Sequence, residues 1–176
     1  MTGLQRRVRR GWMRHDRWAL LPLRVMVGFG FAAHGYAKLA RGPAGFAPIV
    51  AALGFPAPLL TAWATSIVEF AGGILMMSGA LVLPLSFAFA AIMAVAMFGV
   101  HLRYGFSSIR LLALTSDGAR FGPVGYELNL LYLAAVATLA LAGSTPLSVD
   151  RALEERRRRP NETLSASSEA SQRRSA

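Results

Sequence analysis

The sequence predicts an all-α membrane protein: a four-helix transmembrane bundle, up-down-up-down, with both termini cytoplasmic. The 176-residue chain is 54% hydrophobic and 16% charged, with a mean hydropathy of +0.42, and is therefore more apolar than ordinary soluble domains. Four apolar runs are long enough to span a bilayer, since about 20 helical residues cover the hydrocarbon core. The basic residues lie mainly at the two ends of the chain. Together these observations indicate one membrane domain with charged flanks.

The predicted spans cover residues 20–40, 58–80, 81–102 and 125–143. The first follows a basic segment, residues 1–19, and is too long for a signal-peptide core. The prolines of the GFPAP sequence indicate a turn that leads into the second span. The tight connection from Gly79 to Pro84 makes the second and third spans an antiparallel hairpin. The loop of residues 103–124 is expected to hold a short surface helix near residues 109–114.

Residues 144–176 form a charged cytoplasmic tail, with about two helical turns in its ALEERRRR stretch. From Pro160 onward the composition is too polar to form a core, and disorder is expected.

The net charge of +10 is distributed as +5 over residues 1–19, +3 over residues 20–143 and +2 over residues 144–176. Basic segments that bracket an apolar body are typical of cytoplasmic flanks, and this pattern argues against nucleic-acid binding. The absence of cysteine excludes thiolate catalysis, disulfides and thiolate metal clusters.

Ionisable residues interrupt every span. Glu69 is near mid-depth in the second, where a charge costs roughly 2.5 kcal/mol or more and normally has a partner inside the bundle. In the predicted topology, four of the ionisable groups fall in the outer half of the membrane: His34, Lys38, His101 and Glu127. Arg24 lies toward the cytoplasm. We expect a buried polar or ligand-binding set, with no catalytic residue and no metal ligand assigned: Arg24, His34, Lys38, Glu69, His101 and Glu127.

Helical spacing predicts that these groups face the bundle interior. Spacings of three and four residues place side chains on one helix face. Three stripes result: Arg24, Gly28, Phe31, Gly35 and Lys38 on the first span; Ala62, Ser66, Glu69, Gly73 and Met76 on the second; Met93, Met97 and His101 on the third.

Each group also has a simpler interpretation. Glu69 either forms a structural pair with Lys38 or Arg24, or handles protons or binds a ligand. Lys38 alternatively extends its amine to the membrane interface, and His34 alternatively packs with a hydrogen bond to a carbonyl. His101 and Glu127 alternatively face water at the membrane edge.

An ordered series of short motifs resembles the DoxX family of small four-helix membrane proteins. The series covers about residues 20–153: Arg24, Gly28, HGYAKL from His34, LGFP from Leu53, EFAGG from Glu69, Gly105-Phe106, GYELNLL from Gly125, and Ser148-Val149-Asp150. The chain departs from the family's glycine-proline-glycine turn after the fourth helix, where it has Ser144, Thr145 and Pro146.

The resemblance implies a multi-pass protein of the bacterial inner membrane, at most a subunit of a quinone-linked oxidoreductase or oxidative-stress system. No covalently bound cofactor is expected. A quinone would fit an apolar slot with Phe31 and methionines, with His34, Lys38 or His101 donating to its carbonyls. Electrons would come from a soluble or membrane oxidoreductase partner, because the chain has no flavin or nicotinamide fingerprint; a homo-oligomer is compatible with the sequence. The alternatives are a non-redox scaffold or small transporter, and haem ligation by His34 and His101.

Overall fold

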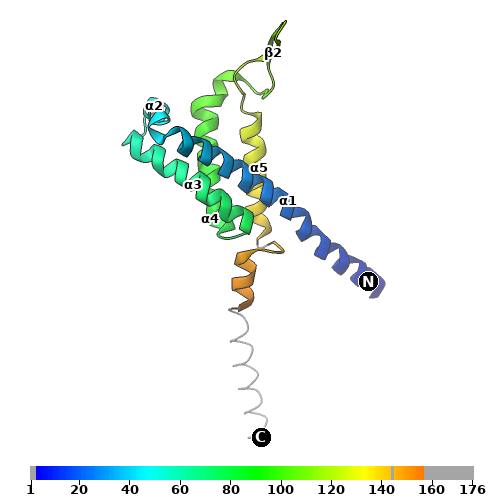
Figure 1. The fold of residues 1–176 in the computed structure, drawn as a ribbon. Helices are drawn as coiled ribbons and strands as arrows, with labels where there is room; N and C mark the ends of the chain where they lie inside the picture. The colour runs from blue at the N-terminus through cyan, green and yellow to red at the C-terminus, as the bar shows by residue number, and fades with distance from the viewer. Residues whose placement is uncertain (1–2, 144, 157–176) are drawn as a thin grey trace, which may run out of the picture.

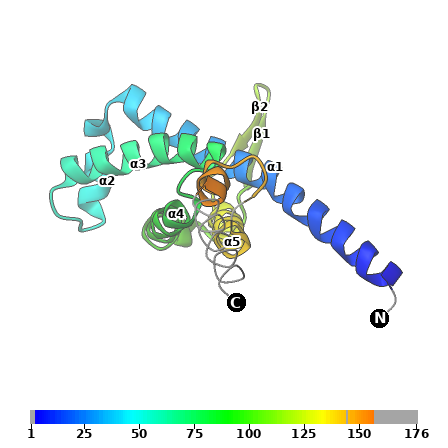
Figure 2. The ribbon, with the colours of Figure 1, turned by 90° about the horizontal axis from the view of Figure 1, so that it is seen from below.

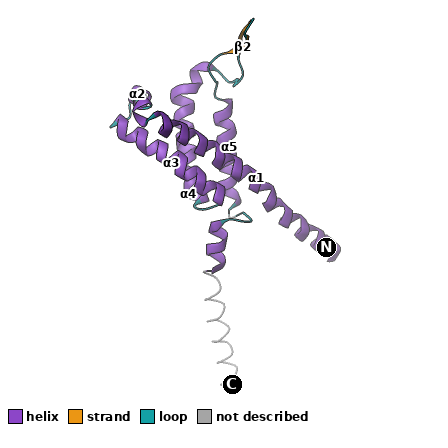
Figure 3. Ribbon diagram, viewed as in Figure 1, coloured by secondary structure: helices purple, strands orange, loops and turns teal. Residues whose placement is uncertain are grey.

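The computed structural model describes residues 3–143 and 145–156, with side chains from Trp18 onward. The expected disorder after Pro160 therefore concerns residues outside the described part. Long helices dominate (Figures 1 and 3): α1 (Gly3–Arg41), α3 (Pro58–Ser78), α4 (Val82–Ala96) and α5 (Glu127–Ala142).

Short elements connect the long helices. Between α1 and α3 lie a 3₁₀ turn, η1 (Pro43–Gly45), and the helix α2 (Ala47–Ala52). The helix α4 continues through a π-helical turn, η2 (Met97–His101), and a 3₁₀ turn, η3 (Leu102–Tyr104). Residues 149–156 are helical, which agrees with the two helical turns expected in the tail as far as the described residues reach. The first predicted span belongs to a longer helix, because α1 begins at Gly3 within the basic segment.

The loop after α4 contains a β-hairpin, so the fold is mostly rather than entirely helical, and the expectation of a surface helix near residues 109–114 is wrong. The strand β1 (Leu111–Thr115) pairs antiparallel with β2 (Gly118–Phe121). Gly118 has a φ of 118°, and the Asp-Gly dipeptide of this loop is a strong hairpin signal. The turn chemistry outweighs the weak helical pattern of the leucines.

The long helices form two pairs that cross. α1 lies beside α3, α4 lies beside α5, and the first pair runs at a steep angle to the second (Figure 1). Seen from below, α2 and the adjoining ends of α1 and α3 extend to one side of α4 and α5 (Figure 2). The β-hairpin and residues 149–156 lie at opposite ends of the α4–α5 pair (Figure 1).

The core forms where the two helix pairs cross. The Phe31 ring stacks on the Phe89 ring with centroids 3.7 Å apart, and Tyr132 meets Phe31 edge-on at 5.4 Å. Val27, Met76 and Val136 complete this buried cluster.

Most other large apolar side chains are exposed. Leu60, Phe87 and Leu131 expose 60% or more of their surface, each on a different helix. Within the described residues, two helical stretches are long and apolar enough to cross a membrane, Pro58–Ser78 and Val82–Tyr104. An apolar exterior on such helices is what a lipid environment requires.

Candidate functional site

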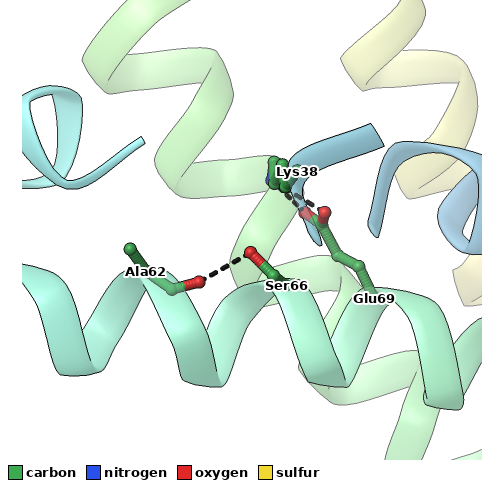
Figure 4. A network of polar contacts seen from close by, with 4 residues as sticks. All are labelled: Lys38, Ala62, Ser66 and Glu69. Atoms are coloured by element: carbon green, nitrogen blue, oxygen red, sulfur yellow. Dashed lines mark hydrogen bonds and ion pairs between the residues drawn. The ribbon is translucent and has the colours of Figure 1, made fainter. Parts of the chain in front are cut away.

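A buried ion pair joins α1 to α3. Lys38 Nζ lies 2.7 Å from both carboxylate oxygens of Glu69, and Figure 4 shows the two side chains meeting between the helices. The Glu69 side chain is only 3% exposed and that of Lys38 24%. The amine also lies 4.4 Å from the centroid of the Phe46 ring, at the start of α2. Of the alternatives left open for Glu69, the structure shows the pair with Lys38 rather than one with Arg24, and Lys38 remains partly exposed.

Glycine and serine on α1 and α3 allow the close approach that this pair requires. A Cβ at Gly35 would lie 2.3 Å from the backbone nitrogen of Phe70, and one at Gly73 would lie 2.4 Å from that of Ala32. Ser66 is buried and donates its hydroxyl to the Ala62 carbonyl (Figure 4). The stripe predicted on the second span, from Ala62 to Met76, is buried throughout, as expected for small residues at a membrane helix interface.

His101 and Glu127 hold the loop between α4 and α5. His101 Nδ1 lies 2.9 Å from the Val124 carbonyl oxygen. The Glu127 carboxylate accepts the Ser108 backbone N–H at 3.0 Å, and the Ser108 hydroxyl accepts the Leu128 N–H. Both side chains therefore fix the two ends of this loop, and they do so through separate contacts.

His34 stands apart from the other predicted groups. It is exposed and has no polar or ring contact within the described residues. It follows Gly30 by one helical turn, so the two share a face of α1. Gly30 faces α5, because a Cβ there would lie 2.0 Å from the Tyr132 hydroxyl oxygen.

Two polar side chains of α5 lie one helical turn apart, with Tyr132 directed toward α1 and Asn129 toward α4. Tyr132 is half-buried, and its hydroxyl has no hydrogen-bond partner among the described residues. Asn129, three residues earlier and 6% exposed, points its amide at Met93, with 3.5 Å to the carbonyl oxygen and 3.8 Å to the sulfur. These are long contacts for an amide donor. We call Gly30, His34, Asn129 and Tyr132 the α1–α5 face.

Arg24, near the middle of α1, lies in a different polar cluster from Lys38. It is 2% exposed, and its guanidinium donates to the Thr145 hydroxyl and to the carbonyls of Pro146 and Leu147. Asp150 accepts the backbone N–H groups of Leu81 and Val82, at 2.9 and 3.0 Å, and so caps α4. We call this set the tail clamp, because it ties the segment after α5 to α1 and to the α3–α4 turn.

Residues 19–102 match the family model DoxX. The chain contains a DoxX domain. No curated protein and no solved structure matches the chain. The match and the apolar helices indicate a membrane protein, and the resemblance based on motif order is confirmed over residues 19–102.

The DoxX domain holds most of the predicted site residues, including the Lys38–Glu69 pair, whereas Glu127, Asn129 and Tyr132 follow the matched range. Sequence reasoning missed Asn129 and Tyr132 as site candidates because neither is charged. An asparagine within an apolar span is nevertheless a signal, since its amide needs a partner in a membrane. The capping role of Asp150 depends on a turn geometry that sequence spacing does not reveal.

Proposed function

We propose that this DoxX protein is a quinone-binding accessory subunit of a membrane oxidoreductase or oxidative-stress system. The helices α1, α3, α4 and α5 cross the bacterial inner membrane, with both termini in the cytoplasm. The basic flanks support this orientation. The apolar exteriors of α3, of the α4–η3 stretch and of the shorter α5 support four spans.

The observation that carries the quinone proposal is the set of weakly bonded polar groups on the α1–α5 face. Polar groups at membrane depth are costly when they lack partners. Tyr132 and His34 have no hydrogen bonds in the described part of the chain, and the Asn129 amide has only long ones. A bound molecule that accepts hydrogen bonds and tolerates lipid would satisfy all three.

A quinone has this chemistry. Its two carbonyl oxygens accept hydrogen bonds, its ring is flat and apolar, and its tail stays in lipid. The Tyr132 hydroxyl and the His34 imidazole supply donors, and the buried Phe31 ring, 5.4 Å from that of Tyr132, holds the Tyr132 side chain in place. The partner oxidoreductase exchanges electrons with the quinone, and this chain positions the headgroup.

The remaining predicted groups have structural roles in this proposal. The Lys38–Glu69 pair fixes α1 against α3 one helical turn beyond His34, and so sets the direction of the imidazole. His101 and Glu127 keep the ends of α4 and α5 together. Both sets of contacts maintain the geometry of the α1–α5 face.

A thermal-protection experiment tests the proposal. A short-chain ubiquinone should raise the unfolding temperature of the purified protein by an amount that grows with ligand concentration. Tyr132→Phe and His34→Ala should each weaken this protection while leaving the unliganded protein folded. Tyr36→Phe is the matched control, because Tyr36 is 62% exposed and lies on a different face of α1. Equal protection of all variants, or none in the wild type with any quinone, would refute the proposal.

The second candidate is a non-redox scaffold, and the tail clamp favours it. Arg24 and Asp150 fasten the cytoplasmic tail to the membrane helices. A scaffold that presents its tail to a partner protein needs such an attachment. This candidate predicts no quinone protection and loss of the partner when the tail is removed.

A further inference from the structure

The β-hairpin has an apolar face that the described residues leave uncovered. In the register of its strands, Leu111 lies opposite Phe121 and Leu114 lies opposite Ala119. Cross-strand partners share a face of a sheet, and so do residues two positions apart on one strand, so we call these four side chains the hairpin face. Every residue of β1 and β2 is exposed, and Leu114 exposes 78% of its surface. Apolar side chains gathered in this way mark an interaction surface.

The rest of the hairpin is basic. Ala113 lies opposite Arg120 on the other face of the sheet, and Arg110 directly precedes β1. The loop of residues 103–124 contains three arginines and one aspartate. An apolar face combined with arginines on the remaining surface is the pattern of an element that lies in a membrane interface, where the apolar side chains reach the acyl chains and the arginines meet the phosphates.

The base of the hairpin lies where the helices leave the bilayer. The α4–η3 stretch, which is long enough to cross a membrane, ends at Tyr104, and α5 begins at Glu127. The rings of Phe106 and Tyr126 meet edge-on at this base, 5.6 Å apart, and tyrosine is typical of the headgroup level of a membrane. The contact of Glu127 with Ser108 fixes the base at this level.

From its base the hairpin reaches sideways. It extends beyond the end of the α4–α5 pair in Figure 1, and it lies to one side of that pair when the two helices are seen end-on in Figure 2. This direction brings it toward lipid beside its own helices. A second copy of the hairpin would bring like charges together, whereas an anionic phospholipid surface offers the opposite charge.

We propose that the hairpin face docks on the bilayer surface, on anionic phospholipids whose phosphate groups contact Arg110 and Arg120. The apolar side chains of the hairpin face enter the acyl region, which covers the surface that the protein itself leaves open. This inference rests on the membrane crossing of α4–η3 and α5 proposed above, and it does not involve the quinone.

Fluorescent labels on the two faces of the hairpin test this proposal. The chain has no cysteine, so Ala119→Cys and Ala113→Cys each give the full-length protein a single labelling site, on the hairpin face and on the opposite face. The labelled proteins would be placed in vesicles of phosphatidylglycerol and phosphatidylcholine. The label at residue 119 should be quenched by doxyl-labelled lipid and shielded from a water-soluble quencher, whereas the label at residue 113 should stay open to the water-soluble quencher.

A charge variant tests the role of the two arginines. Arg110→Gln/Arg120→Gln should shift the hairpin roughly thirtyfold toward the undocked state, because two arginines near an anionic surface contribute about that factor. The label at residue 119 should then lose most of its quenching by lipid, as it should in vesicles of phosphatidylcholine alone. Arg103→Gln is the control, since Arg103 belongs to η3 and lies 5.0 Å from the centroid of the Tyr104 ring, and it should keep the quenching.

Three results would overturn the proposal. Equal access of the water-soluble quencher to both labels would show that the hairpin face is not covered. Unchanged lipid quenching in the double variant, or in phosphatidylcholine alone, would show that the arginines do not bind the phosphates. Shielding of residue 119 that increases with the number of protein molecules per vesicle would show that a second copy covers the face.

Two further measurements keep these results separate from other failures. A thermal scan of each variant in detergent checks that it is folded. An error in the proposed spans would appear in reporter fusions at Gly45 and Asp117, and the absence of a quinone site would appear in the thermal-protection experiment without changing the label quenching.

Discussion

The Lys38–Glu69 pair provides the sharpest stability prediction. Glu69→Gln keeps the shape of the side chain but leaves the Lys38 amine without its counter-charge. Breaking a buried ion pair by removing one partner typically costs 3–5 kcal/mol. We expect about 3 kcal/mol here, at the low end, because the Lys38 side chain keeps 24% exposure and its stem is long enough to turn toward water. For a chain of this size, that loss lowers the unfolding temperature by roughly 6–12 °C.

The double variant separates a lost pair from a general packing defect. Adding Lys38→Met removes the uncompensated cation, so Glu69→Gln/Lys38→Met should recover part of the stability that the single variant loses. The measurement is the unfolding temperature in one detergent for the wild type, both single variants and the double variant. Additive losses would show that the two side chains do not interact and would refute this assignment of the pair.

Three further predictions concern packing, the tail clamp and topology. Gly35→Ala should lower the free energy of unfolding by about 3 kcal/mol, because the new methyl group would lie 2.3 Å from the Phe70 backbone nitrogen. Gly45→Ala is the control and should be neutral, because a methyl group there has open space. Similar unfolding temperatures for the two variants would contradict the close packing of α1 on α3. Asp150→Ala should lower the free energy of unfolding by about 1–2 kcal/mol, because it removes the cap of α4, and an unchanged thermal scan would show that the clamp contributes nothing. Reporter fusions should place Gly45 and Asp117 outside and both termini inside, and a periplasmic C-terminus would refute the topology.

Much of the helical structure follows from the sequence, because apolar run length and spacing act locally. The predicted second span, residues 58–80, differs from α3 by two residues at its end. The ion pair was also predictable. A mid-span carboxylate requires a partner, and the stripes of α1 and α3 that carry Lys38 and Glu69 contain the small residues that bring the helices together.

The remaining features depend on geometry that spacing alone does not encode. The crossing of the two helix pairs leaves His34 exposed. Its side chain does not make the hydrogen bond to a carbonyl that was one of its two interpretations from the sequence. His101 and Glu127 find partners in the loop between them because that loop folds back as a hairpin. The partners of Arg24 come from residues more than 120 positions later in the sequence, and no periodic pattern links them.

Photo-labelling with an azido-quinone tests the central claim most directly. The protein would be irradiated in membranes with and without an excess of unmodified quinone, and the labelled peptides would be mapped. The account predicts saturable labelling of α1 near His34 and of α5 near Tyr132, and a large decrease of both in Tyr132→Phe. Labelling that excess quinone does not reduce, or that lies only on the lipid-exposed side of α3 around Leu60, would contradict the assignment of the α1–α5 face as a quinone site.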